Sequence, residues 1–338
     1  MSSARASVFL GAAILALHLM TARTYAASFD CGTASTPERK AVCASPVLSG
    51  LDEKIADTYR AALARLSPAG QSALTENQDQ WIEATTAACA NLFDDFSLLP
   101  GCLEMPYRLR QRDLATAVQS VGPFTFLRMS SYQFVPCHAA LQCDGSFREG
   151  GYVHTSVPRI DVPATDATAR WNVRVAEKIP PLRSQDNTDV NLDFRVAGAS
   201  ADMISVRFDL SEYAHRAAHG SVFILGFNAT LPAVAPIAAD DVFAPDAPWR
   251  PFLYGRVMDL VHASLMRTGW DQDTQIAPEL MRNVVERPER WVFTPAGLEI
   301  MFGPYDLGFY VSVPHDATIP WAELQPYLRK PLPFQLPQ

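Results

Sequence analysis

Four cysteines in the first third of the chain constrain the fold most, because they frame three stretches with helical periodicity. Cys31 and Cys43 precede the first stretch, Cys89 ends the second, and Cys102 opens the third. Disulfides persist in oxidising compartments, and small units with little apolar surface to bury depend on them. The pattern predicts a disulfide-stapled three-helix bundle that works outside the cytosol.

The first 26 residues have the three parts of an export signal. Arg5 supplies a positive charge, residues 8–20 form an apolar run, and residues 24–26 give a small-residue cleavage site. The apolar run is too short to span a bilayer; the alternative is a buried N-terminal helix. No cysteine directly follows the cleavage site, which argues against a lipid anchor, and no later stretch is apolar enough to cross a membrane. We therefore expect a periplasmic or secreted mature protein.

The charge balance disfavours some partners. The chain has 28 Lys and Arg against 36 Asp and Glu, a formal charge of −8, which becomes −10 when Arg5 and Arg23 leave with the signal. A negative field disfavours nucleic acid and anionic membranes and favours basic partners. Acidity also serves solubility alone, so it only supports a choice of partner.

The pattern of elements changes at about residue 120, and the length suggests two domains. Residues 28–120 read as the helical domain, with helices starting at Pro46 and Pro68 and a third from Cys102 to Val118. Residues 121–338 read as a mixed α/β domain with an antiparallel sheet, which makes the whole chain α+β. Its expected strands cover 152–160, 190–196, 203–213, 221–231, 291–294, 298–302 and 308–313, and its expected helices cover 167–178, 252–267 and the residues after 320.

Geometry suggests one pairing of the four cysteines. In an antiparallel hairpin the start of the first helix lies beside the end of the second, which favours Cys43–Cys89 and leaves Cys31–Cys102 outside it. Four cysteines allow three connectivities, so this nested pairing is a hypothesis. Further along, Cys137 and Cys143 are expected to close a short loop. A zinc site there, with His138, is the alternative, but the spacing fits no standard motif.

Residues 28–114 resemble the N-terminal domain of LprI-type lysozyme inhibitors. Two positions depart from that pattern: the acidic residue before the second cysteine is one place early, at Glu38, and Thr85 stands where an Arg is usual. The positions that carry the resemblance are Phe29, Asp30, Cys31, Thr36, Pro37, Cys43, Pro46, Leu48, Leu51, Asp52, Tyr59, Gln78, Trp81, Cys89, Cys102 and Leu103.

A second resemblance lies in the C-terminal part. The segments at 291–298, 302–305 and 319–324 are similar to the end of the extracellular domain of RsiV-type anti-sigma factors, which sense lysozyme by binding it. The segment around His219 and Phe227-Asn228 matches less closely, because Ala217 replaces a glycine. The resemblance implies a role at the cell envelope and transfers no contact residue.

Reactive motifs are scarce in the sequence. His215 and His219 stand four apart, but no Glu follows the first, so a metalloprotease motif is missing. His315-Asp316 has no Gly-x-Ser-x-Gly nucleophile to serve. Asn228 begins a glycosylation sequon, but the sequon lies inside an expected strand, so we expect the match to be incidental and not a glycosylation site. We assign no catalytic, cofactor-binding or metal-ligating residue.

One connection in the helical domain combines aromatic and acidic side chains. Phe93, Asp94, Asp95 and Phe96 lie between Cys89 and Cys102, where they could hold a cationic surface by aromatic contacts and charge. The alternative is a solvated loop with inward phenylalanines. Trp81 and Tyr59 are expected in the core, and Asp52 is expected to face solvent or cap a turn.

Together these features favour an exported, non-enzymatic binding protein that engages a lysozyme-like cationic muramidase, as an inhibitor or as a lysozyme-binding protein. Inhibition would come from steric and electrostatic occlusion. The alternative is a cell-envelope hydrolase or a peptidoglycan-modifying accessory protein. A sensory role is a third option, although a sensor of the anti-sigma type needs a membrane span.

Overall fold

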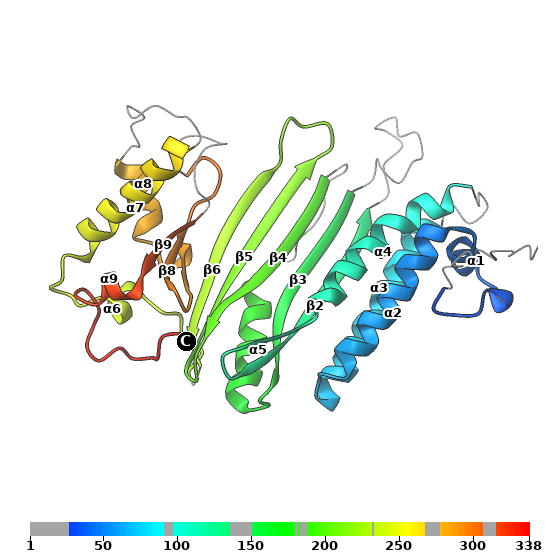
Figure 1. Ribbon diagram of the computed structural model, residues 1–338, viewed down its shortest axis with the longest axis horizontal. Coiled ribbons are helices and arrows are strands. Elements are labelled where there is room, and N and C mark those ends of the chain that lie inside the picture. Colours follow the sequence, from blue (N-terminus) through cyan, green and yellow to red (C-terminus); the bar gives the residue numbers. More distant parts are fainter. Residues whose placement is uncertain are drawn as a thin grey trace, which may run out of the picture.

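The computed structural model describes residues 27–90, 97–135, 151–179, 182, 188–231, 233–267, 278–306 and 316–338. A group of helices comes first, a long twisted sheet follows, and a smaller sheet with its own helices ends the chain (Figure 1). This arrangement confirms the α+β prediction. The expected signal peptide, the loop at 93–96, Cys137, His138, Cys143, His315 and the strand at 308–313 lie outside the described residues.

Local capping signals set the first helices. Thr36, Ser45 and Ser67 each accept a hydrogen bond from a backbone N–H of the first turn, and a proline follows each of them. This combination of N-cap and first-turn proline is favourable because the proline removes an N–H that would have no partner. The helices are α1 (Pro37–Ala44), α2 (Pro46–Leu63), α3 (Pro68–Cys89) and α4 (Leu99–Ala115), preceded by a short 3₁₀ turn, η1 (Cys31–Thr33).

The disulfides join other partners than the predicted ones. Cys31 bonds to Cys43 and Cys89 bonds to Cys102, so the nested pairing Cys43–Cys89 with Cys31–Cys102 is wrong. The reason is packing: α2 lies mainly against α4, not α3, so the start of α2 is not beside the end of α3. The hairpin of α3 and α4 brings Cys89 and Cys102 together. Helix α1, which the sequence pattern did not predict, brings Cys43 back to Cys31.

The two disulfides form a matched pair for a stability measurement. They close loops of nearly equal separation, 12 and 13 residues, so each is expected to stabilise the fold by about 3 kcal/mol. Cys89 and Cys102 are buried, whereas Cys31 is exposed. Replacing Cys89 and Cys102 by serine therefore adds the cost of burying hydroxyls, about 1–3 kcal/mol. Urea unfolding should show the larger loss for that variant, and equal losses would contradict this reading.

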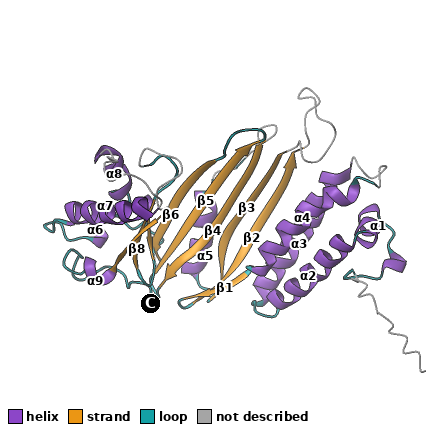
Figure 2. Cartoon of the chain, turned by 45° about the horizontal axis from the view of Figure 1, so that its top comes forward, coloured by secondary structure: helices purple, strands orange, loops and turns teal. Residues whose placement is uncertain are grey.

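The large sheet runs in sequence order β1-β2-β3-β4-β5-β6 among the described residues. All neighbours are antiparallel except β3 and β4, which are parallel. A parallel pair needs a crossover, and α5 (Asp166–Lys178) provides it behind the sheet (Figure 2). The strands are β1 (Val118–Val121), β2 (Phe124–Val135), β3 (Gly151–Val162), β4 (Thr188–Ala199), β5 (Met203–Ala214) and β6 (Ser221–Thr230).

Helix α5 buries the apolar face of the large sheet. Trp171 is fully buried among side chains of several strands, and its ring lies edge-on to Phe126, 5.9 Å between centroids. Thr165 and Thr168 form a reciprocal capping box that fixes the start of the helix. Side chains alternate between the two faces of the sheet along β4 and β5, so Phe194 and Phe208 pack into the same core as Trp171.

Helix α3 is held at both ends and at its centre. At its start the buried carboxylate of Asp161 accepts the backbone N–H and the hydroxyl of Ser67, at 2.8 and 2.6 Å. At its centre Asn77 donates to the Ser130 carbonyl on the part of β2 that β1 does not cover. At its end Cys89 is bonded to Cys102. The helices thus shield an edge that would otherwise be open to other strands.

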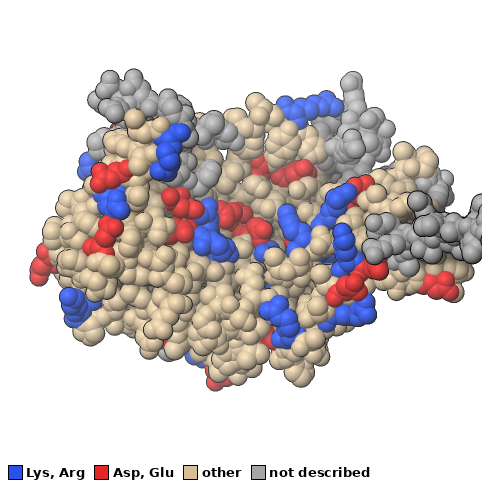
Figure 3. Space-filling view, viewed as in Figure 1, with Lys and Arg blue, Asp and Glu red and all other residues tan. Residues whose placement is uncertain are grey.

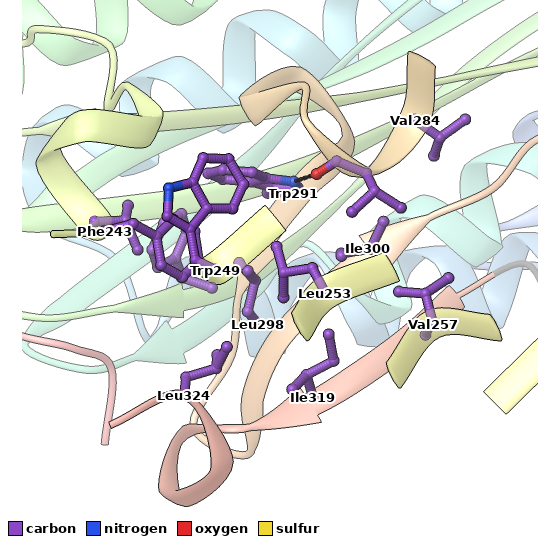
Figure 4. Packing of buried hydrophobic residues seen from close by; sticks show 14 of the residues in the cluster. Phe243, Trp249, Leu253, Val257, Val284, Trp291, Leu298, Ile300, Ile319 and Leu324 are labelled. Atoms are coloured by element: carbon purple, nitrogen blue, oxygen red, sulfur yellow. Dashed lines mark hydrogen bonds between the residues drawn. The ribbon is translucent and has the colours of Figure 1, made fainter. Parts of the chain in front are cut away.

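The last third of the chain builds the small antiparallel sheet, β7 (Trp291–Phe293), β8 (Gly297–Met301) and β9 (Asp316–Pro320). Its core gathers Trp249, Leu253 and Trp291, whose indole N–H donates to the Val285 carbonyl (Figure 4). The helices here are α6 (Ala239–Val242), α7 (Trp249–Arg267), α8 (Pro278–Val285), the 3₁₀ turn η5 (Pro288–Arg290) and α9 (Trp321–Leu324). None of the helices in the described part of the chain could span a membrane.

The expected strands at 152–160, 190–196, 203–213, 221–231, 291–294 and 298–302 are confirmed within a few residues. The third helix was predicted too far along: it ends at Ala115, and Val118 begins β1. The hairpin of β1 and β2 was missed, and Gly122, with a φ of 55°, forms its turn.

Candidate functional site

Charged side chains gather across the middle of the face of the large sheet that is opposite α5 (Figure 3). We call this surface the charged face. The ladder places Asp193 opposite Asp209 and Arg195 opposite Arg207, two like-charged pairs that would each destabilise the sheet. Arg128 compensates the first pair, since its guanidinium lies 2.5 Å from Asp193. The second pair is compensated by Asp209, which lies 2.9 Å from the Arg207 guanidinium, and by the small sheet.

The small sheet supplies two carboxylates to the charged face. Glu299 accepts from Arg195 at 2.5 Å and from Arg207 at 3.4 Å, and Asp316 also accepts from Arg207. Burial and the nearby Asp316 raise the pKa of Glu299, although the two arginines oppose that shift. For Arg207, burial alone would lower the pKa, but Asp209 and Asp316 raise it above its usual value. These contacts hold the small sheet on the large one.

A buried polar network lies at the other end of the same face. The Asp113 carboxylate of α4 accepts from His154 Nε2 at 2.7 Å and from the Tyr132 hydroxyl at 2.5 Å. His154 Nδ1 lies 2.7 Å from Asn191 Oδ1, and His154 is fully buried. Burial would raise the pKa of Asp113, but the bonds and charge of His154, the Tyr132 hydroxyl and the charge of Arg128 lower it below its usual value.

This network has the residue types of a hydrolytic triad without its geometry. Ser156 Oγ lies 3.4 Å from His154 Nε2, the same nitrogen that binds Asp113. In a triad the nucleophile and the orienting carboxylate use opposite ring nitrogens. The network instead fixes α4 against β2 and β3. Sequence reasoning missed it, because only the strand pairing shows that Tyr132 and His154 face one another.

The histidines singled out in the sequence lie apart from that network. His215 Nε2 lies 3.2 Å from Asp189, and His219 Nε2 lies 3.4 Å from the Tyr305 hydroxyl. In the described residues no group of three His, Cys, Asp or Glu is placed to hold a metal. Asn228 of the sequon is buried between the sheets and donates to the Trp291 carbonyl at 2.8 Å.

The outer side of α3 is the most one-sided acidic surface of the helical unit. Glu76, Asp79 and Glu83 are exposed at spacings of three and four, and this helix of 22 residues contains neither Lys nor Arg. None of the three forms an ion pair with a described residue, although Gln80 donates to Glu76. We call these three residues the acidic face of α3.

Other predicted residues are placed as follows. Trp81 is buried in the helical core with its ring edge-on to Tyr107, 5.1 Å between centroids, and Tyr59 packs against the same core. The Asp52 carboxylate accepts the Ser28 N–H at 2.7 Å, so it caps the start of the described chain. The predicted binding loop at 93–96 stays a prediction, and the Cys89–Cys102 disulfide closes the segment that contains it.

Comparison with known proteins gives limited matches. No curated protein matches the chain. A DUF3298 family protein from Pseudomonas aeruginosa PAO1 has 14% identity and a TM-score of 0.45, covering 64% of this chain and 98% of its own. A DUF3298 member from Bacteroides fragilis NCTC 9343 has 14% identity and a TM-score of 0.39, covering 62% and 96%. The family model of DUF3298, a protein of unknown function, matches residues 240–322, which hold α7, α8 and the small sheet.

Proposed function

We propose that this chain is an exported, non-enzymatic binding protein that engages a lysozyme-like cationic muramidase and occludes it. The observation that carries the proposal is the acidic face of α3, Glu76, Asp79 and Glu83, on a helix held by Asp161, Asn77 and Cys89. A rigid surface loses little entropy on binding, and a single-signed surface accelerates encounter with a partner of opposite charge.

Two further features support the partner class. The disulfides Cys31–Cys43 and Cys89–Cys102 suit a non-cytoplasmic compartment, where muramidases act. The resemblance of the helical unit to LprI-type inhibitors and of the C-terminal segments to RsiV-type domains points to lysozyme in both cases. Occlusion then follows from the size of the folded chain and needs no reactive group.

Titration calorimetry with a c-type lysozyme tests the proposal. We expect micromolar or tighter binding at low salt, and a weakening of about tenfold or more when the ionic strength rises to physiological values. The triple variant Glu76→Gln, Asp79→Asn, Glu83→Gln should lose affinity by about tenfold or more, because it removes all three charges of the acidic face.

A charge-matched control separates this surface from net charge. Asp240→Asn, Asp246→Asn and Glu279→Gln remove three exposed charges from the opposite end of the chain and should leave affinity unchanged. Equal weakening by both triple variants would mean that any acidic surface suffices. If lysozyme gives no binding heat at micromolar concentration while Cys31–Cys43 and Cys89–Cys102 are intact, a muramidase is not the partner.

A further inference from the structure

Among the described residues, the outer edge of β6 has no hydrogen-bonded neighbour over its first half. Ile237 donates its backbone N–H to the Asn228 carbonyl, and Thr230 donates its own N–H to the following turn, both at 3.0 Å. Asn228 and Thr230 therefore turn their backbone groups away from β5, as alternate residues of an antiparallel ladder do. Val222 and Ile224 stand an even number of residues before Asn228, so their backbone groups also face away from β5. Within the described ranges nothing bonds to these outward N–H and carbonyl groups.

A cleft of about 630 Å³ runs along this open edge. Residues Val222 to Leu225 form one wall, and η5 with Arg287 and the turn from Gly303 to Asp306 form the other. A Cβ on Gly303 would stand 3.7 Å from the Val222 carbonyl oxygen, so the turn lies close to β6 at that end and any side chain at position 303 would narrow the cleft. The phenyl group of Phe223 beside the cleft is 57% exposed.

An apolar pocket meets the same stretch of β6 from the α5 side. It measures about 170 Å³, and its lining includes Phe208, Leu210, Phe223 and Leu225, with Ile179 at the end of α5. Side chains of a strand alternate between the two faces of a sheet. A strand added beside β6 would therefore direct every second side chain toward this pocket.

We propose that the cleft binds an extended peptide segment of a partner protein by β-strand addition to β6. Its main chain pairs with the outward groups of Val222 and Ile224, and one large apolar side chain enters the pocket beside Phe223 and Leu225. Strand addition of this kind takes affinity from the backbone and specificity from such pockets. This site is separate from the acidic face of α3 and does not depend on it.

Charge in the cleft selects the peptide further. Arg290 is paired with Asp306, 3.0 Å between Nη1 and Oδ2, whereas Arg287 is exposed with no ionic partner among the described residues. Glu289 also lines the cleft and is exposed. The fitting segment carries a carboxylate opposite Arg287. A second copy of this chain would have to bring its own β6 edge, which is flanked by the same wall, so a separate extended segment suits the cleft better.

Peptide selection from a phage-displayed dodecamer library on the mature protein tests the site. We expect enriched sequences that alternate large apolar and polar residues around an acidic one. Synthetic copies should bind the wild type and slow amide hydrogen exchange at residues 221–225. Ile224→Pro, which removes an outward donor and no bond to β5, should weaken binding by about tenfold or more. Arg287→Ala should weaken it by about tenfold as well.

Controls make the result decisive. Arg282→Ala removes an exposed charge outside the cleft and should leave peptide affinity unchanged. If Ile224→Pro does not fold, Gly303→Leu fills the cleft from its far wall and should abolish binding. The proposal is overturned if no peptide is enriched, or if enriched peptides bind Gly303→Leu and Arg287→Ala as they bind the wild type.

Discussion

Replacing Gly226 by alanine is expected to lower the free energy of unfolding by about 3 kcal/mol, the cost of overpacking a tight contact. Gly226 lies on β6 where the small sheet crosses it. A Cβ there would stand 2.2 Å from the Trp291 carbonyl oxygen and 3.2 Å from its carbon. Both atoms belong to backbone, so the two sheets must separate to admit the methyl group. Urea unfolding of the purified variant measures the loss.

Gly255 is the matched control for that substitution. It lies inside α7, and apart from its chain neighbours and the nearby backbone of the same helix no atom is within 4 Å of its ideal Cβ position. Gly255→Ala should therefore stabilise the protein by about 0.5–1 kcal/mol, because alanine loses less entropy in a helix than glycine does. A stable Gly226→Ala variant would show that the sheets are not in contact at Gly226.

Replacing Asp113 by asparagine is expected to cost about 3 kcal/mol near neutral pH, because it leaves His154 and Tyr132 without their buried anionic partner. The pKa of Asp113 is lowered from 3.8 in the folded protein, so its contribution is fully present above the unfolded value. It is lost as the pH falls through the folded pKa. The difference between wild type and variant should therefore shrink in acid.

Unfolding curves at about pH 7 and about pH 3 measure this difference. Asp246→Asn serves as the control, since Asp246 is exposed and should change stability little at either pH. A difference that stays constant between the two pH values would mean that the carboxylate charge of Asp113 does not stabilise the fold.

Sequence periodicity predicted those helices and strands that bury one apolar face and leave the other face polar. Pro46 and Pro68 with their serine caps mark two helices, and the alternation of Leu192, Phe194 and Val196 marks a strand with one apolar face. These signals are local, because each depends on residues within one or two turns or pleats.

The remaining features depend on long-range contacts that no local pattern reveals. The disulfide pairing followed from α2 lying against α4, and Asp161 caps α3 although 94 residues separate it from Ser67. In the sequence alone, the buried polar residues of β2 and β3 cannot be told from exposed ones. Only the strand register shows that they face one another. The missed hairpin had one local sign, Gly122-Pro123, which is typical of a turn.

We propose above all that this chain is a rigid acidic binding protein for a cationic muramidase. Sedimentation velocity of the mature protein mixed with a c-type lysozyme tests it most directly. We expect one faster-sedimenting complex at low salt, which dissociates as salt is added and does not form with the acidic-face variant. Two independent boundaries at every ratio and salt concentration would contradict it.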